Sequence, residues 1–373
     1  MIKHLHIIGA GLAGLSAAVE ARKNGVSCTI YEATKKAGGR IRQARNHDNG
    51  THLIVKGYEA TFAYLNQIGM SETLSPFGNG AYSFTEPASH LSWKVKANHF
   101  VWQVAKGSIP GVNATNIVGK TAKDRLWDPF FLAVFNTDLK DVPAQLRKNM
   151  FFEMLKQGPS ALIPYFCQNT LEDTFVRPLL DQFDIRFGKR LTNVDENQLV
   201  FKDEQITLKK TDRVILALPP QAYAQITSPF DFSAITCNPI SNFHFDLDSD
   251  AEECFVGLIG TRSQWLYAKG RHACVTISNQ KFESSEISKQ IWMEVRPLLG
   301  LDDCQMPPCR LVCEKHATPA QNMDFATRRP QTKTHIANIF LAGDWIDTGL
   351  PATIESAIRS GKWAVKGAID NKR

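Results

Sequence analysis

The chain of 373 residues is 43% hydrophobic and 21% charged, a globular composition that excludes disorder as the default and leaves room for two domains. Its net charge of +6 arises from 43 basic and 37 acidic residues without a dense basic run, so we expect no nucleic-acid partner. No segment approaches the roughly 18 apolar residues of a membrane span, and no signal-peptide pattern follows Met1. We therefore expect a cytoplasmic protein and leave peripheral contact with the inner membrane open.

The first elements of the chain form a dinucleotide-binding pattern. An apolar run over residues 5–8 leads into a glycine-rich turn, and apolar residues at helical spacing follow as far as Gly25, the expected helix stop. A second strand over residues 26–31 ends on Glu32, whose carboxylate, followed by Ala33, is placed to accept from ribose hydroxyls. The turn supplies the other predicted nucleotide contacts, which are Gly9, Gly11, Leu12, Ala13 and Gly14.

Each glycine of this turn has a physical task. Gly9 permits the tight turn, Gly11 lets the backbone approach a pyrophosphate, and Gly14 lets the helix pack on the strand. The helix N-terminus adds amide donors and a positive dipole for the phosphates. NAD and FAD share this pattern, so the turn does not choose between them.

The segment after Glu32 favours FAD. Gly38, Gly39 and Arg40 resemble the GG-R segment of the amine oxidase and phytoene desaturase class of flavoproteins. In that class the segment lies along the FAD pyrophosphate and the arginine supplies positive charge. The resemblance therefore implies bound FAD and an oxidoreductase.

The C-terminal part of the chain independently resembles the same class. A strand-like run over residues 338–342 ends in Gly343 and Asp344, and a helix is expected over residues 355–368. The resemblance implies that Asp344 bonds the ribityl chain of FAD. It also implies that three residues present backbone atoms to the flavin ring, namely Ala352, Thr353 and Ile354.

The middle of the chain is predicted to return to the nucleotide-binding domain. Residues 185–209 contain short strands, and residues 212–220 read as a buried strand that ends in a Pro-Pro stop. By resemblance Val194 contacts the adenine, although a plain core residue is an equal alternative. We predict an α/β fold with a Rossmann-like FAD-binding domain over 1–60, 171–221 and 306–373. A mixed α+β substrate domain is inserted over 61–170 and 222–305.

The first inserted segment is expected to be mostly helical, and the second to hold strands over 241–247 and 272–277 and a helix over 284–299. No second GxGxxG follows, so we expect an external electron donor. Large apolar surface in the first segment comes from Trp102, Trp127, Phe130, Phe131, Phe135, Phe151 and Phe152.

The eight cysteines contain no CxxC pair. The one cluster consists of Cys304, Cys309 and Cys313 with His316 nearby, and its spacing does not fit a structural zinc site. Buried, reduced thiols are the better interpretation, and we predict no metal.

Further motifs are Asp48-Asn-Gly50 with His52, Gly57-Tyr58, Arg125 to Pro129, Asn136-Thr137, Gln264-Trp265 and Gly343 to Glu355. Together they resemble the bacterial hydroxysqualene dehydroxylase family, whose members are also known as squalene-associated FAD-dependent desaturases. This resemblance implies reductive removal of water from a C30 allylic alcohol to give squalene for hopanoid synthesis, with hydride from reduced FAD. Thr51, where the family commonly has Gln, and Asp128, where it often has Glu, depart from the pattern.

The implied reaction needs a proton donor beside the leaving hydroxyl and an apolar pocket that excludes water. Asp48, His52 and Asp128 are the candidates. Asp48 is equally a turn-forming residue, and His52 titrates near neutrality but is equally a structural histidine. Asp128 gains a raised pKa if it is buried against its aromatic neighbours, and is otherwise a helix N-cap before Pro129.

Two other functions share these motifs. A carotenoid-type desaturase or amine oxidase would use FAD to oxidise its substrate and would have the same FAD motifs. A flavin-binding protein without catalysis is the alternative from another class. Composition and spacing do not separate these from the dehydroxylase.

Overall fold

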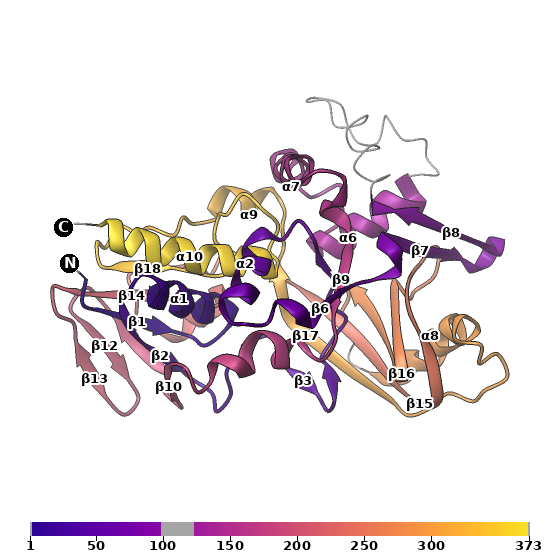
Figure 1. Ribbon diagram of the computed structural model, residues 1–373, viewed down its shortest axis with the longest axis horizontal. Helices are drawn as coiled ribbons and strands as arrows, with labels where there is room; N and C mark the ends of the chain where they lie inside the picture. The colour runs from indigo at the N-terminus through magenta and orange to yellow at the C-terminus, as the bar shows by residue number, and fades with distance from the viewer. Residues whose placement is uncertain (1, 98–122, 283, 372–373) are drawn as a thin grey trace.

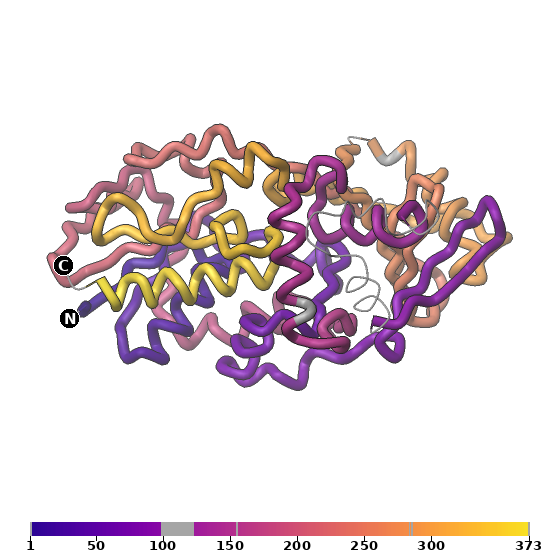
Figure 2. The backbone as a smooth tube through the Cα atoms, turned by 90° about the horizontal axis from the view of Figure 1, so that it is seen from above, coloured from indigo at the N-terminus to yellow at the C-terminus, as the bar shows by residue number. Residues whose placement is uncertain are grey.

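The computed structural model describes residues 2–97, 123–282 and 284–371 of an elongated molecule (Figure 1). A parallel sheet with its helices forms one half, and a sheet of long strands forms the other. The chain passes between the halves several times, and both of its ends lie at the outer end of the first half (Figures 1 and 2). Among the described residues, no helix is both long enough and apolar enough to cross a bilayer.

The first half is built on a five-stranded sheet whose paired neighbours all run parallel, in the order β10-β2-β1-β14-β18. All five residues of β14 are buried, as expected for a strand covered on both faces. The strands are β1 (His4–Ile8), β2 (Ser27–Glu32), β10 (Asp184–Phe187), β14 (Asp212–Leu216) and β18 (Ile339–Leu341).

Alternate residues of these strands enter two separate cores. Ile7 and Ile215 pack with helices α1 (Leu12–Lys23) and α10 (Ile354–Asp370), which lie side by side although they come from opposite ends of the chain (Figure 2). Ile8 packs on the other face, against a small antiparallel sheet. That sheet consists of β11 (Leu191–Val194), β12 (Gln198–Phe201) and β13 (Gln205–Thr207).

The second half is built on β15 (Cys237–Leu258), which pairs antiparallel with β16 (Trp265–Ser278). The first part of β15 also pairs with β17 (Cys309–Pro319), and its last part pairs with β7 (Ala81–Glu86). Strand β8 (Leu91–Lys96) completes the sheet beside β7.

Helices cover this second sheet. Phe243 and Phe245 of β15 pack with Ile291 and Trp292 of helix α8 (Ser288–Val295). A second cluster of apolar residues joins the sheet to helices α6 (Asp128–Phe135) and α7 (Ala144–Gln157). The remaining elements are β3 (Gln43–Ala44), β4 (His47–Asp48), β5 (Ile54–Val55), α2 (Glu59–Gln67), β6 (Leu74–Pro76), β9 (Pro164–Cys167), α9 (Met323–Arg328) and short 3-10 and π turns.

The structure confirms the α/β class and most predicted strands, and corrects three details. The segment after residue 61 is not mostly helical, because β7 and β8 form a hairpin in the second sheet. Helix α2 packs with α10 in the first core, beyond the predicted boundary at residue 60. Strand β17 pairs with β15, so the second sheet extends past the predicted boundary at residue 306. Trp102 lies outside the described residues.

Candidate functional site

The glycine-rich turn lies between β1 and α1, as predicted. Gly9 has a φ of 105°, and a Cβ on Gly14 would lie 2.0 Å from the Gly9 carbonyl oxygen, so helix and strand approach too closely for any side chain there. The first turn of α1 leaves the amides of Leu12 and Ala13 without an intrahelical acceptor. These amides are available to an anion at the helix N-terminus.

Gly11 is different from Gly14, because the protein itself does not fill the space beside it. A Cβ on Gly11 would meet only the Cα of Gly39, at 4.0 Å. Gly11 and Gly38 form an isolated parallel bridge, and the Gly38 amide donates to the Ala10 carbonyl at 2.8 Å. The two predicted phosphate-contacting segments therefore lie side by side and form an open cradle that fits a pyrophosphate.

Glu32 lies at the end of β2, where the resemblance requires it. Its two carboxylate oxygens accept from the amides of Ala10 and Thr34, each at 2.9 Å. These bonds hold the carboxylate beside the glycine-rich turn. Oε1 also accepts from the Thr34 hydroxyl at 2.9 Å, whereas Oε2 accepts only from Ala10 among the described residues and retains a lone pair for a ribose hydroxyl. Ala33 follows it directly, and the ribose contact remains a prediction.

Arg40 and Asp344 meet across the chain. The Arg40 guanidinium donates to Asp344 at 2.5 Å and to the Ala317 carbonyl at 2.6 Å. Asp344 is buried, whereas the Arg40 side chain is 43% exposed. Burial alone would lower the pKa of Arg40, but the Asp344 carboxylate outweighs it and raises that pKa. An ion pair therefore joins the two segments that the sequence predicts to contact FAD.

The loop after Asp344 is held by a residue that sequence reasoning missed. The Arg329 guanidinium donates to the carbonyls of Asp344 and Leu350, at 3.1 and 2.8 Å, and to that of Trp345 at 3.3 Å. Burial lowers the pKa of Arg329 to about 10. The only sequence signal is an arginine before Pro330, because its partners are backbone carbonyls and not a recognisable charged residue.

The predicted flavin-ring segment lies at the start of α10. The Ala352 amide is already used, since it donates to the Gln321 side chain at 2.8 Å. Thr353 is the helix N-cap and Ile354 is its first residue, so their amides remain without an intrahelical acceptor. Of the three predicted backbone contacts, those of Thr353 and Ile354 are therefore the better placed.

Val194 lies in the core between the two sheets of the first half. Its side chain is 1% exposed, and its amide donates to the Thr227 carbonyl at 3.0 Å. The protein thus uses both groups, which favours the alternative of a plain core residue. The adenine contact stays a prediction.

Asp48 lies where the hairpin β3–β4 meets the second half. Its carboxylate accepts from the Leu171 amide at 2.9 Å. Burial, with the carboxylates of Asp173 and Glu172, raises its pKa to about 7, against the opposing effect of the Leu171 hydrogen bond. Asp48 is the more enclosed of the two candidate carboxyl donors.

His52 does not titrate near neutrality as predicted. Burial, with the nearby Arg40 charge, lowers its pKa to about 4. Its Nε2 is 3.5 Å from the Asn49 side-chain oxygen. A ring that is neutral at pH 7 holds no ready proton for a leaving hydroxyl, so His52 suits a hydrogen-bonding role better.

Asp128 is not buried against its aromatic neighbours. Its side chain is 38% exposed and forms a 2.7 Å ion pair with Lys123. The helix N-cap alternative is also wrong, because α6 begins at Asp128 and Trp127 is its N-cap. The carboxylate is therefore partly open to solvent and already bound to a cation, unlike the enclosed Asp48.

The described aromatic residues that were predicted to supply large apolar surface, apart from the exposed Phe152, gather in one cluster between the second sheet and helices α6 and α7. Trp127 stacks on Phe131, and Phe131 stacks on Phe135. The sheet contributes Phe255 stacked on Trp265. The Gln264 side chain, just before β16, donates to the carbonyl of Ser278 and accepts from its amide at the end of that strand. The cluster gives the second half an aromatic interior.

Comparison with known proteins identifies the family. The model for the NAD(P)-binding Rossmann-like domain matches residues 7–68, and that for the flavin containing amine oxidoreductase matches residues 111–369. The hydroxysqualene dehydroxylase of Zymomonas mobilis is 32% identical and covers 98% of this chain and 99% of its own length. The chain belongs to the hydroxysqualene dehydroxylase family. The enzyme of that name from Sinorhizobium fredii is also 32% identical, over 99% of both chains.

The fold is also similar to that of a solved oxidase. Cyclohexylamine oxidase from Brevibacterium oxydans superposes with a TM-score of 0.72 over 100% of both chains at 12% identity, which concerns the fold alone. The cofactor of this hydroxysqualene dehydroxylase family member is FAD, and the cradle at Gly11, the amides of α1 and the Arg40–Asp344 pair fit it.

The Asn-Thr motif of this dehydroxylase family member links the two halves at the flavin segment. The Thr137 hydroxyl accepts from the Gln321 amide at 3.0 Å, and the Gln321 side chain donates to the Phe135 carbonyl and accepts from Ala352. Asn136 donates to the carbonyl of Asn238 at 3.2 Å. The motif therefore positions Gln321 and, through it, the start of the flavin-ring segment.

Glu355 and Tyr58 of the other motifs also acquire roles. The buried Glu355 carboxylate accepts from the amides of Ala60 and Thr61, at 3.0 and 2.9 Å, and so binds the N-terminus of α2. Arg359 pairs with it at 3.1 Å. The Tyr58 hydroxyl contacts Thr353, and burial raises its pKa to about 12. Tyr58 is thus a second polar group beside the flavin segment, to which the sequence assigned no role.

Proposed function

We propose that this chain removes the hydroxyl of hydroxysqualene reductively to give squalene. The proposal rests on 32% sequence identity, over nearly the full chain, to enzymes named for this reaction. It is supported by an FAD cradle in one half and an aromatic interior in the other. Bound FAD, once reduced, supplies the hydride. The substrate C–O bond breaks, the oxygen leaves as water after taking a proton, and hydride completes the new C–H bond.

The protein's own contribution is to supply the proton and exclude water. Asp48, His52 and Asp128 remain the proposed donors, and we place Asp48 first because it is enclosed and has a single described hydrogen bond to a backbone amide. Asp128 is partly exposed and paired with Lys123. An allylic cation survives only where water is absent, which is the role we assign to the aromatic cluster around Phe131.

The electrons come from outside this chain in our proposal. The first half contains one dinucleotide fold, and its glycine-rich turn meets the requirements of FAD. A nicotinamide-binding domain of the same type would need another GxGxxG, which the sequence lacks. A separate reductase or a diffusing reduced carrier is the expected donor.

We further propose peripheral contact with a lipid surface, because the proposed substrate is a C30 alcohol whose carbon chain is almost entirely apolar. Phe152 and Trp363 are 58% and 42% exposed. Glu153, next to Phe152, pairs with Arg359, one helical turn before Trp363, so the ion pair joins their two helices. Lys156 and Lys366 are exposed on the same helices. Exposed aromatic rings with nearby lysines suit an anionic membrane interface.

The test of function is an anaerobic assay of the purified FAD-loaded chain with dithionite as reductant and hydroxysqualene as substrate. Squalene formation that requires both FAD and reductant supports the proposal. Oxidation of phytoene or an amine by the aerobic enzyme, without squalene formation, would replace it with the desaturase or amine oxidase alternative. Bound flavin with neither reaction would leave a non-catalytic role.

Membrane contact is tested by co-sedimentation with vesicles of phosphatidylglycerol and phosphatidylethanolamine. The double variant Phe152→Ser, Trp363→Ser should bind them at least about fivefold more weakly than the wild type. Met293→Ser is the matched control, since Met293 is also 58% exposed but lies on α8 in the second half. Equal weakening by both variants would show that the α7–α10 surface is not the contact.

A further inference from the structure

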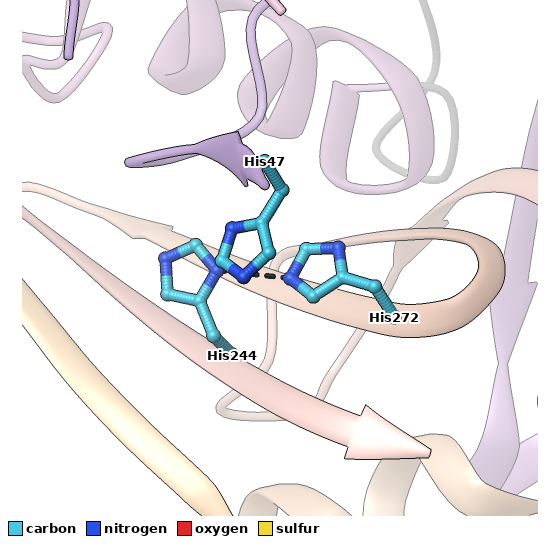
Figure 3. Close-up of side chains that lie close together, drawn as sticks. All are labelled: His47, His244 and His272. Atoms are coloured by element: carbon cyan, nitrogen blue, oxygen red, sulfur yellow. Dashed lines mark hydrogen bonds between the residues drawn. The ribbon is translucent and has the colours of Figure 1, made fainter. Parts of the chain in front are cut away.

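Three histidines from distant parts of the chain meet where the hairpin β3–β4 contacts the second sheet. His47 comes from β4, His244 from β15 and His272 from β16 (Figure 3). One side-chain nitrogen of each lies within 4.8 Å of those of the other two. None of the three belongs to the FAD cradle or to the proposed donors. We propose that this cluster binds one divalent transition-metal ion such as Zn²⁺.

Backbone carbonyls fix the protonation of two of the rings. His47 Nδ1 lies 3.1 Å from the Asp48 carbonyl oxygen, and His244 Nε2 lies 3.2 Å from the Asn49 carbonyl oxygen. A carbonyl oxygen only accepts, so these nitrogens carry the protons. The opposite nitrogens, His47 Nε2 and His244 Nδ1, therefore present lone pairs. Metal-bound histidines are held in this way by hydrogen bonds from the nitrogen that does not touch the metal.

The lone pairs are only partly satisfied within the protein. His244 Nδ1 is 3.1 Å from His272 Nε2, which must donate to it. His47 Nε2 is buried and has no hydrogen-bond partner among the described residues. Three ring nitrogens thus share one proton. A metal ion bound by all three replaces that proton, which moves to Nδ1 of His272, and leaves each ring neutral.

The rings are already in the protonation state that a metal requires. Burial and the neighbouring rings lower the pKa of His244 to about 4 and that of His272 to about 3. Burial also lowers the pKa of His47. At pH 7 a metal ion therefore does not compete with protons for these nitrogens.

The charges around the cluster set its expected affinity. Arg310 faces it and donates to the Ala44 carbonyl at 3.1 Å, and Arg45 pairs with Asp246 at 2.8 Å. Asp246 follows His244 by two residues on β15, so it shares its face, and it pairs in register with His272. Two cations against one carboxylate weaken cation binding, so micromolar affinity is expected.

Coordination requires the rings to turn. In Figure 3 the His47 ring lies over the His244–His272 hydrogen bond, and it stacks on His272 at 3.7 Å with 15° between the planes. Near-parallel rings cannot all point a nitrogen at one ion. The torsion between Cβ and the ring is soft in histidine, and His47 and His272 are only half-buried, so rotation of these two rings closes the site without moving the backbone.

A bound ion would clamp the hairpin that directly follows Arg40 to the two long strands of the second half. The hairpin β3–β4 contributes one ligand and the sheet contributes two. Metal binding should therefore stabilise the junction of the halves, and it does not depend on which substrate the enzyme uses. Sequence spacing gave no sign of this site, because its ligands are separated by 197 and 28 positions (47 to 244, and 244 to 272) and meet only through the sheet register.

The experiment titrates Zn²⁺ into untagged, FAD-loaded protein that has been stripped with EDTA, by calorimetry and by metal analysis after dialysis. One equivalent should bind with a dissociation constant of about 10 µM or lower, and Zn²⁺ should raise the unfolding midpoint. His272→Gln should weaken binding at least about tenfold and abolish the midpoint rise. His316→Gln, an exposed histidine on β17 of the same sheet, is the matched control and should bind as the wild type does.

Each variant must retain its flavin absorbance, which shows that it has folded. If His272→Gln loses flavin, His47→Gln on the hairpin tests the same prediction from the other side of the site. Binding that persists unchanged in the histidine variants but disappears after thiol alkylation would assign the metal to cysteines and overturn the proposal. Binding below about 0.2 equivalents by the wild type would also overturn it.

Discussion

The two halves of this enzyme differ in the groups that form their parts of the site, which are main-chain atoms in one half and side chains in the other. In the nucleotide-binding half the main chain forms most of the cofactor cradle: the turn at Gly11, the amides of α1 and the carbonyls around Arg329. In the second half, the aromatic cluster to which we assign the exclusion of water is built from side chains, from Phe131 on a helix to Trp265 on a strand. A main-chain site imposes residue types at fixed spacing, whereas a side-chain site imposes only size and polarity at positions that the sheet brings together.

This difference also determines what a substitution does in each half. A glycine that leaves room for a ligand has no other task, so its replacement should affect the ligand alone. A side chain in a packed interior serves both the pocket and the core. The comparison therefore predicts separable effects in the first half and combined effects in the second.

The largest effect is expected from Gly11→Val. A side chain there meets only Gly39 at van der Waals distance but occupies the path of the pyrophosphate, so bound flavin should be lost completely while the apoprotein keeps its unfolding midpoint. Flavin absorbance near 450 nm and thermal unfolding of the apoprotein measure the two. Gly14→Ala is the contrast, because its Cβ would lie 2.0 Å from a carbonyl oxygen and should destabilise the apoprotein itself. Normal flavin content in Gly11→Val would show that the pyrophosphate of FAD does not lie beside Gly11.

The next effect concerns the second half. Asp48→Asn should reduce the rate of squalene formation about 100-fold with flavin content unchanged, because general acid catalysis contributes about 10²–10⁴-fold. Asp128→Asn is the matched control, and should change the rate less than about threefold since Asp128 is paired with Lys123. The reverse ranking would move the donor to the start of α6 and show that the α6 region lies nearer the hydroxyl.

Sequence reasoning succeeded where the chemistry is local and failed where it is distant. The strands and helix around Gly9, and the pair of segments at Arg40 and Asp344, were predicted because backbone geometry and a cofactor's shape constrain neighbouring residues. Gln321 and Arg329 were missed because they bind backbone groups that any sequence offers.

The errors in the second half have a common physical cause. The β7–β8 hairpin was mistaken for part of a helical region because β7 pairs with β15, far away in sequence, and the hairpin gains its stability there. Burial decided the pKa of His52, and an ion pair decided the environment of Asp128. Neither can be read from the neighbouring residues, since both depend on which elements pack against them.

A smaller effect tests whether the first half depends on one long-range ion pair. Arg40→Met leaves Asp344 buried without its partner, and should weaken FAD binding roughly 10–30-fold and destabilise the protein by roughly 2 kcal/mol. The cost is below that of a fully buried pair, because the Arg40 side chain is 43% exposed. Fluorescence titration of the apoprotein with FAD measures the first quantity and urea unfolding the second. The double variant Arg40→Met, Asp344→Asn should recover part of the stability but not the affinity, and recovery of both would show that FAD does not use these groups.

The smallest effect is expected from His6→Asn, and it tests whether the two halves unfold together. Burial, with the neighbouring His4, lowers the pKa of His6 in β1 from 6.5 to about 4, against the opposing effect of Asp212. The unfolded chain therefore binds more protons between these values, so this contribution to stability is complete above about pH 6.5 and is lost as the pH falls through about 4. His6→Asn should flatten the decline in unfolding free energy over that window by about 1–2 kcal/mol, measured by urea unfolding at several pH values.

The readout of this last experiment separates the halves. Flavin release reports the first half, and tryptophan fluorescence is weighted towards the second, where Trp127 and Trp265 lie. If the ion pairs and strands that cross between them make one cooperative unit, His6→Asn should change both transitions equally. A change confined to flavin release would show two units that unfold separately. The main-chain site would then owe its stability to the parallel sheet alone, and the aromatic interior would fold without it.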